Sequence, residues 1–317
     1  VDDCSPDDSQ EKIQAWIDAH QVPCRFIRHG ENIGLCASIN EALPQLRGKY
    51  LQFVACDDRQ LPHKLKVQIP LLEADASVGV VCGDFQTIDA EGQVVSPSYF
   101  SSDYRFPAED TFAAILSGHA DRGIIIHSPT TLSRMEAVME AHPWPEHIVQ
   151  EDFYLWLHIT QKYQAAFVPQ VVTAYRSLAT SMSNTLIKGP QRIKYLRDHL
   201  FVTDTLLEKA LPSRKELLLR DQVKRRLKLM STLISNRKSL GKKEYSQMLE
   251  EQIEKLKALF ANHPQFEQPV KFARNLFRAF RAGRSWALDE QAYRKHLSAK
   301  SRLYLKTSQG LAKIFGR

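Results

Sequence analysis

Two adjacent carboxylates, Asp57 and Asp58, follow an apolar stretch over residues 50–55 that predicts a strand. A turn containing a proline comes next, and then a helical pattern over residues 61–74. In an open α/β sheet, ligands gather beyond the carboxyl ends of the strands. Carboxylate oxygens at such a place can hold a divalent cation, and the cation can neutralise a phosphate-bearing substrate. The acidic pair therefore predicts a metal-assisted site.

Other carboxylates stand at similar boundaries. Asp2 and Asp3 lie in a turn near the start of the chain, Asp84 follows a predicted strand, and Glu151 and Asp152 begin a predicted helix. Each has a structural alternative, because acidic groups are stabilised at helix N termini and are common in turns. Position alone leaves both interpretations open.

The elements that must position these groups alternate between strands and helices. This rhythm indicates βαβ units, and hence an α/β fold whose mostly parallel sheet is flanked by helices. We expect helices over 9–20, 35–43, 61–74, 133–142 and 150–163, strands over 24–29, 50–55, 78–89 and 123–128, and a strand pair or hairpin edge over 165–176.

Charge divides the chain into two regions. Residues 1–184 hold 13 Lys and Arg against 24 Asp and Glu, a net charge of −11, whereas residues 185–317 have a net charge of +18. Long helical patterns with Leu-rich and Lys/Arg-rich faces dominate the second region. We therefore predict a domain over 1–184 and a basic α-helical region over 185–317, with an anionic partner for the latter.

The ends and the cysteines give weaker signals. The turn at Asp2 has no complete strand before it, so we expect an upstream strand and helix to be missing. The five cysteines match no CxxC zinc pattern and are expected to be reduced thiols. The sequence shows no signal peptide, and no apolar run reaches 18 residues.

The order of motifs resembles family 2 glycosyltransferases, which are GT-A-fold enzymes that use nucleotide-sugars. The matching motifs are VDDCSPD, NIGLCASIN, GKYLQFVACDD, LPHKL, a GDF strand, ED on a helix and a closing YR, all within residues 1–183. The resemblance implies that 1–184 is a GT-A catalytic domain, with its first strand and helix missing, that transfers a sugar with inversion.

The resemblance also implies roles for the donor-site residues. Asp3 would bind the uracil imide with Asp2 beside it, and Asn32 and Gly34 would lie close to the phosphates or the sugar. Asp84 would orient the donor sugar, and Arg176 would contact the diphosphate. The alternatives are a helix cap at Asn32, a tight turn at Gly34, a turn residue at Asp84 and a surface ion pair at Arg176.

The metal and the base follow from the same resemblance. Asp58 would be the main ligand of Mn²⁺ or Mg²⁺, and Asp57 would touch the ribose or the metal. The chain departs from the D-x-D pattern, because Ala55 stands two residues before Asp57. Asp152, with Glu151 beside it, would be the general base that deprotonates the acceptor hydroxyl.

The basic region suggests where the enzyme acts. Residues 271–284 and 300–317 form basic amphipathic patterns that suit an anionic membrane surface, although a docked helical bundle or a partner-binding helix explains them equally. We expect a cytoplasmic enzyme, peripheral at the inner face of the plasma membrane, and no nucleic-acid partner.

These inferences lead to one main hypothesis and two alternatives. The chain would transfer a sugar, with a UDP-sugar as the expected donor, to a hydroxyl of a glycan or lipid-linked acceptor in cell-surface polysaccharide synthesis. One alternative is a non-catalytic GT-A-like scaffold that recruits an assembly complex or a membrane. The other is a nucleotidyltransferase on a related sheet.

Overall fold

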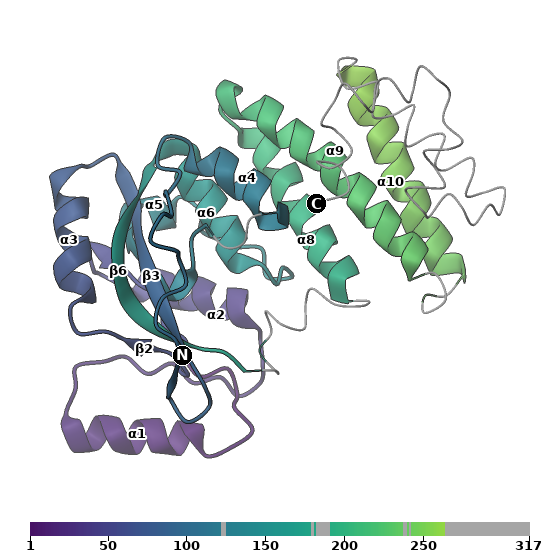
Figure 1. The fold of residues 1–317 in the computed structure, drawn as a ribbon. Coiled ribbons are helices and arrows are strands. Elements are labelled where there is room, and N and C mark those ends of the chain that lie inside the picture. Colours follow the sequence, from purple (N-terminus) through teal and green to yellow (C-terminus); the bar gives the residue numbers. More distant parts are fainter. Residues whose placement is uncertain (122–124, 179–180, 182–190, 237–239, 241, 264–317) are drawn as a thin grey trace. The chain divides into compact units, whose positions relative to one another are not determined.

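The computed structural model describes residues 1–121, 125–178, 181, 191–236, 240 and 242–263 (Figure 1). The chain divides into two compact units. Unit 1 comprises Val1–Ile115 and Ile126–Ser177, and unit 2 comprises Leu116–Ile125 and Leu178–Arg317. The two basic amphipathic patterns at 271–284 and 300–317 lie outside the described residues.

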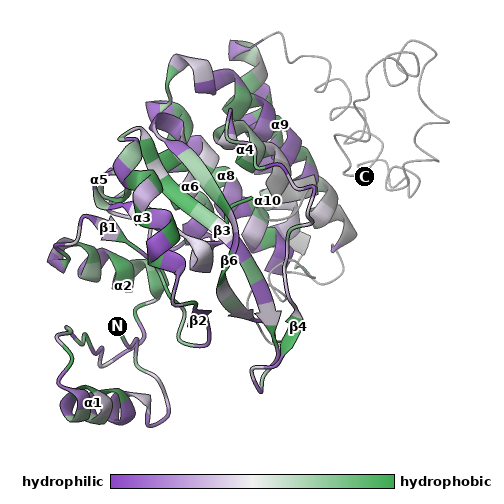
Figure 2. Cartoon of the chain, turned by 60° about the vertical axis from the view of Figure 1, so that its left-hand side comes forward, coloured by the Kyte–Doolittle hydropathy of each residue, from purple (hydrophilic) through white to green (hydrophobic). Residues whose placement is uncertain are grey.

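Two long parallel strands form the centre of unit 1. Strand β3 (Val78–Ile88) pairs with β6 (Gln164–Arg176) from Val78 opposite Gln164 to Ile88 opposite Arg176. Most of β3 is buried, because its near-continuous apolar run packs on both faces (Figure 2). Strand β6 is one continuous strand that lies between β3 and β2, so the expected hairpin edge over 165–176 is wrong.

Short antiparallel strands complete the sheet. Among the described residues, β1 (Tyr50–Leu51) pairs with β5 (Leu132–Arg134), β5 and β4 (Val94–Ser96) pair with β3, and β2 (Arg59–Gln60) pairs with β6. The α/β class is confirmed, but the sheet is mixed rather than mostly parallel. The reason is that the short strands β1, β2, β4 and β5 all pair antiparallel, and the expected strand over 50–55 forms only two ladder residues.

Two further expected strands are not formed as predicted. The segment 24–29 contributes a single parallel bridge, between Arg28 and Asp2. Of the segment 123–128, the described part has no strand and leads into a 3₁₀ turn over Ser128–Thr130. Ile125 and Ile126 are nevertheless buried. The apolar pattern of this segment therefore reflects burial in the core and not pairing in the sheet.

An irregularity in β6 explains how a proline fits within a central strand. Val168 pairs with Gly83 and Val171 pairs with Asp84, so Pro169 and Gln170 are left outside the ladder. Proline has no N–H to donate, and an unpaired position removes that conflict.

Helices flank the central strands. In unit 1, α1 (Ser9–His20), α2 (Leu35–Ala42), α3 (Lys64–Ala74), α5 (Met135–Met139) and α6 (Glu151–Lys162) agree with the predicted segments. Helices α3 and α6 each contact both β3 and β6, and they lie on opposite sides of these strands (Figure 1). Helix α4 (Thr111–Asp121) begins in unit 1 and ends in unit 2.

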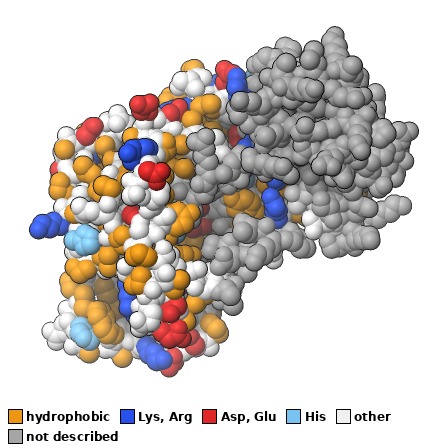
Figure 3. Space-filling view, in the orientation of Figure 1, with side chains coloured by type: hydrophobic (Ala, Val, Ile, Leu, Met, Phe, Trp, Pro, Cys, Tyr) orange, Lys and Arg blue, Asp and Glu red, His pale blue; other side chains and the backbone are white. Residues whose placement is uncertain are grey.

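The described part of unit 2 is mainly helical, as the sequence predicts. Its described helices are α8 (Gln191–Lys209), α9 (Pro212–Ser235) and α10 (Lys242–Asn262), and α9 contacts both of the others through apolar clusters. Within the described part of the chain, no helix is long and apolar enough to cross a bilayer. The coloured part of Figure 3 mixes acidic, basic and hydrophobic side chains on the face that it shows.

Candidate active site

The acidic turn after β1 is attached to the end of β6. The N–H of Asp58 donates to the carbonyl of Ala55, which closes the turn at 3.2 Å. The N–H of Arg176 donates to Oδ1 of Asp58 at 2.9 Å. The other oxygen, Oδ2, is buried and has no hydrogen-bond partner among the described residues, while Asp57 is exposed. The turn thus presents one exposed carboxylate and one half-buried carboxylate with an unused oxygen.

The electrostatics of this turn favour a cation. Burial raises the pKa of Asp58 above its ordinary value, and the negative charge of Asp57 raises it further. The N–H from Arg176 offsets only part of this effect. A buried carboxylate oxygen without a donor is costly, so a bound cation would relieve both the repulsion and the missing contact.

Arg176 binds backbone carbonyls around the turn. Its Nε donates to the carbonyl of Asp57 at 2.9 Å, and its Nη1 donates to the carbonyls of Asp89 and Ala90 at 2.5 and 2.6 Å. This guanidinium group therefore ties the acidic turn to the turn after β3. In the observed conformation Arg176 positions the site, and its predicted contact with a diphosphate remains a prediction.

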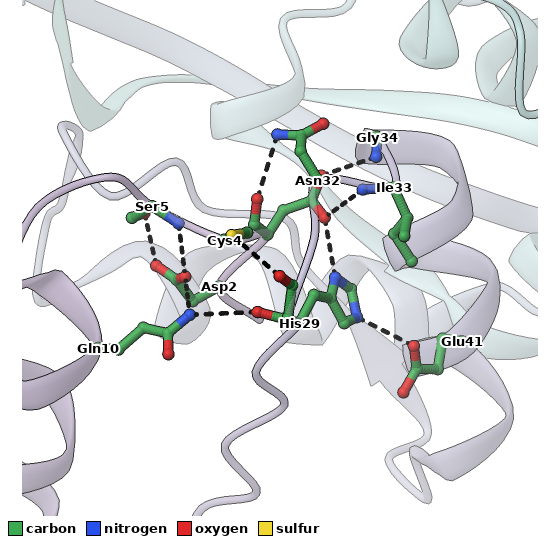
Figure 4. Close-up of polar contacts among 11 residues, drawn as sticks. Asp2, Cys4, Ser5, Gln10, His29, Asn32, Ile33, Gly34 and Glu41 are labelled. Atoms are coloured by element: carbon green, nitrogen blue, oxygen red, sulfur yellow. Dashed lines mark hydrogen bonds and ion pairs between the residues drawn. The ribbon is translucent and has the colours of Figure 1, made fainter.

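Asp3 connects the N-terminal segment to the loop before α2. Its Oδ1 accepts from the N–H of Ile33 at 2.8 Å and lies 2.9 Å from Nδ1 of His29, and its Oδ2 accepts from the N–H of Gly34 at 2.8 Å. Asn32 donates from Nδ2 to the carbonyl of Asp3 at 3.1 Å (Figure 4). Gly34 has φ of +90°, which favours glycine. The structure brings Asp3, Asn32 and Gly34 together.

The charge of Asp3 is well supported by these contacts. Burial alone would raise the pKa of Asp3, but the N–H groups of Ile33, His29 and Gly34 bring it below its ordinary value. An ionised carboxylate offers about four acceptor sites, and three are used here. One acceptor site therefore remains for a further donor.

Asp2 has a structural role in the described contacts. It is 6% exposed, and it accepts from the N–H and the hydroxyl of Ser5 and from Nε2 of Gln10. The hydroxyl of Ser5, followed by its N–H, lowers the pKa of Asp2 to about 2. The side chain therefore fixes the loop before α1 (Figure 4).

Asp84 also holds a loop. Its Oδ1 accepts from the N–H groups of Phe85, Tyr99 and Phe100 at 2.7, 3.1 and 3.2 Å, and its Oδ2 accepts from the hydroxyl of Ser98. These contacts anchor the aromatic segment after β4, and the ring of Tyr99 stacks on Phe85 with centroids 4.5 Å apart. The carboxylate is 7% exposed, and we expect it to shape the donor site through this loop.

Glu151 and Asp152 form the first turn of α6. The carboxylate of Asp152 accepts from the N–H of Phe153 at 2.6 Å. Burial raises the pKa of Glu151 to about 8, and the charge of Asp152 adds to this effect. The raised pKa favours the protonated form of Glu151 at neutral pH.

Sequence reasoning missed two residues beside these groups. His29 lies between Asp3 and Glu41, and Lys64 lies behind the acidic turn with only 1% of its surface exposed. Lys64 Nζ donates to Oε1 of Gln60 at 2.6 Å and to the carbonyl of Pro129 at 2.7 Å. Lys64 belongs to the LPHKL motif, which was its one signal in the sequence, whereas His29 had none. Histidine and lysine side chains in helical or strand patterns are usually exposed to solvent, so neither residue type drew attention.

Comparisons with known proteins agree with this fold. Residues 1–134 match the family model described as glycosyl transferase family 2. An uncharacterized glycosyltransferase of Methanocaldococcus jannaschii is 22% identical over 152 residues, which are 48% of this chain and 50% of that protein. The chain thus spans about half the length of this curated relative.

Solved structures show the same fold at low identity. The crystal structure of S. aureus TarS residues 1–349 superposes with a TM-score of 0.56 at 17% identity, covering 94% of this chain and 82% of that chain. The crystal structure of S. aureus TarS gives a TM-score of 0.50 at 12% identity, covering 86% and 48%. The expected GT-A fold, with a helical region after it, is confirmed.

Proposed function

We propose that this chain, whose residues 1–134 match the model of glycosyl transferase family 2, transfers a sugar from a nucleotide-sugar to an acceptor hydroxyl. The observation that carries the proposal is the acidic turn, where the buried Oδ2 of Asp58 has no hydrogen-bond partner among the described residues. A carboxylate in this state suits a substrate that arrives with a cation.

The residues present fit a divalent cation that is shared with the substrate. In the described part of the chain, no group of three or more His, Cys, Asp or Glu side chains is arranged to hold a metal. Mg²⁺ commonly uses one or two carboxylates together with substrate phosphates and water. Asp58 and Asp57 would supply those carboxylates. A bound Mn²⁺ or Mg²⁺ supplies Lewis-acid stabilisation of the charge that develops on the leaving diphosphate.

A UDP-sugar is the proposed donor. The remaining acceptor site of Asp3 can take the imide N–H of uracil, while Asn32 and Gly34 keep the neighbouring loop close to the base. Arg176 would hold the acidic turn beside the diphosphate through its carbonyl contacts.

Asp152 is the proposed general base. Burial raises the pKa of Glu151 to about 8, and a group that is protonated at neutral pH is poorly suited to act as a base. The base is therefore assigned to its neighbour on the first turn of α6. The acceptor oxygen would form a bond to the anomeric carbon as the bond to the diphosphate breaks. The hydroxyl proton would pass to Asp152, and the nucleoside diphosphate would leave with the bonding electrons. A single displacement of this kind inverts the anomeric centre.

The acceptor and the cellular site are also proposals. A glycan or lipid-linked acceptor in cell-surface polysaccharide synthesis suits an enzyme with a +18 region over residues 185–317, because an anionic membrane would attract it. On this proposal the enzyme is cytoplasmic and peripheral at the inner face of the plasma membrane.

Calorimetry with the full chain tests the donor site. UDP and a panel of UDP-sugars are titrated with and without Mn²⁺ into the wild type, Asp58→Asn and the matched control Asp18→Asn, which changes an exposed carboxylate on α1. Mn²⁺-dependent binding that is lost only in Asp58→Asn supports the proposal. Absence of binding to UDP and to every UDP-sugar, with and without Mn²⁺, would overturn the proposed donor site and favour a scaffold.

A further inference from the structure

We propose that His29, held between Asp3 and Glu41, is a positioning residue that orients Asp3 for the donor base and makes donor affinity depend on pH. This inference rests on the proposed function, because it assumes that Asp3 binds the base. His29 itself touches neither donor nor acceptor in the proposal, and it acts through Asp3.

The geometry around the imidazole is symmetrical. Nδ1 of His29 lies 2.9 Å from Oδ1 of Asp3, and Nε2 lies 3.0 Å from Oε2 of Glu41 (Figure 4). Ionised carboxylates only accept hydrogen bonds, and a neutral imidazole can donate from only one nitrogen. Both contacts are therefore satisfied together only when the ring carries two protons.

The backbone of His29 is fixed independently of its side chain. Its N–H donates to the carbonyl of Asp2 at 3.0 Å, and the N–H of Asp2 donates to the carbonyl of Ile27 at 2.9 Å. Gln10 donates from Nε2 to the carbonyl of His29 at 3.4 Å. Replacing the imidazole should therefore leave the chain path in place, and a change in binding can be assigned to the side chain.

The charged groups that face the ring favour its protonated form. They are Asp3 from the N-terminal segment and Glu41 from α2, while Gln10 from α1 has an uncharged amide that binds the backbone carbonyl of His29. The hydrogen bond to Asp3 raises the pKa of His29 above its ordinary value of 6.5, and Glu41 adds to this effect against the opposing effect of burial. Only 9% of the imidazole is exposed.

The direction of the pH effect follows from the raised pKa. The two ion pairs are fully present below the ordinary pKa of histidine, and they are lost as pH rises through the raised pKa. At a pH above the raised pKa the ring is neutral and can donate to only one carboxylate. The lone pair of its other nitrogen then points at the oxygen of the second carboxylate, which is also an acceptor. When the one remaining proton lies on Nε2, the Nδ1 lone pair faces Oδ1 of Asp3, so Asp3 should turn away and its acceptor site would lose its orientation.

Variants of the full chain separate titration from hydrogen bonding. His29→Asn keeps an amide donor near the position of Nδ1 but cannot titrate, and His29→Leu removes the donor. His20→Asn, at the exposed end of α1, is the matched control. UDP binding in the presence of Mn²⁺ is measured by calorimetry from pH 6.5 to 8.5. Titration of UDP itself appears in every variant, so the difference between variants reports His29.

For each protein the ratio of UDP affinity at pH 6.5 to UDP affinity at pH 8.5 is compared with the same ratio for His29→Asn. We expect this ratio to be about tenfold larger in the wild type and in His20→Asn. His29→Leu should bind weakly at every pH. Histidine NMR of the ligand-free protein should show one imidazole with a raised pKa that falls in Glu41→Gln.

Two results would overturn the inference alone. The first is a UDP affinity that depends on pH in the same way in the wild type and in His29→Asn. The second is a protein that binds UDP but whose His29 imidazole titrates at or below its ordinary pKa. If the wild type binds no UDP at any pH, the proposed function fails and this inference fails with it.

Discussion

Lys64 and Pro129 are joined by a 2.7 Å hydrogen bond from the buried ammonium group to a backbone carbonyl, although they lie 65 residues apart. The hydroxyl of Thr173 donates to the same carbonyl at 2.9 Å. Because Lys64 also binds Gln60, which follows the acidic turn by two residues, this network connects α3, β2, β6 and the 3₁₀ turn. We expect it to set the position of Asp57 and Asp58.

The first prediction concerns the protonation of Lys64. Burial lowers the pKa of Lys64 to about 7, with the charge of Asp58 opposing the shift. Between pH 7 and the ordinary lysine pKa, the unfolded chain binds more protons than the folded chain, so stability rises with pH. Relative to Lys64→Met, the wild type should therefore gain melting temperature from pH 7 to pH 10. The exposed variant Lys66→Met is the control. If the difference in melting temperature between the wild type and Lys64→Met does not change from pH 7 to pH 10, the prediction is wrong.

Glu151 should show the opposite dependence. Burial raises the pKa of Glu151 to about 8, so the folded chain binds more protons than the unfolded chain above the ordinary pKa of glutamate. Wild-type stability should then fall, relative to Glu151→Gln, as pH rises from about 5 to 8. Thermal melts of both proteins across this range test the prediction. If the two curves remain parallel, Glu151 is already ionised in the folded chain.

The proposed base gives a prediction about activity. Asp152→Asn should reduce sugar transfer about 10²- to 10⁴-fold, because the acceptor hydroxyl would lose its proton acceptor. Donor affinity should stay unchanged, since the base acts on the acceptor. Product formation measured beside UDP calorimetry separates the two effects. Equal losses of donor binding and transfer would assign Asp152 a structural role, and Glu146→Gln, at an exposed position before α6, serves as a control.

Arg176 gives a prediction about metal affinity. Arg176→Lys keeps the charge but cannot reproduce the simultaneous contacts with the carbonyls of Asp57, Asp89 and Ala90. We expect Mn²⁺ affinity in the presence of UDP to fall about tenfold, as for the loss of one charged hydrogen bond. Electron paramagnetic resonance of Mn²⁺ measures it directly. Arg105→Lys, at an exposed loop position, should bind Mn²⁺ like the wild type.

The sequence predicted the helices better than the strands. Helix periodicity is local, and the segments that became α1, α2 and α6 could be recognised from their own residues. Strand pairing depends on distant partners. The apolar residues over 165–176 could not reveal that β6 pairs in parallel with β3, and the apolar residues over 123–128 indicated burial without indicating a strand.

The candidate site divides in the same way. Adjacent carboxylates such as Asp57 and Asp58 are visible in the sequence because their types and their positions after a strand are distinctive. His29 and Lys64 are distinctive only through contacts with residues that are far along the chain, so their types alone gave no reason to choose them. Asp2 and Asp84 show the converse, since each looks like a binding carboxylate in the sequence but accepts hydrogen bonds from backbone and side-chain donors of its own loop.

The irregular pairing of β6 bears on how this protein can change in evolution. Between the first and last paired positions, β6 has two more residues than β3, and Pro169 and Gln170 account for the largest departure from regular pairing. Side chains alternate between the two faces of a strand, so removing two residues keeps the facing of Thr173 and Arg176, whereas removing one reverses it. Without a further one-residue irregularity, such as the one opposite Asp84 and Phe85, relatives that differ in length at this point should differ by an even number of residues. A lineage that lost a single residue would have to rebuild both the lysine network and the acidic turn.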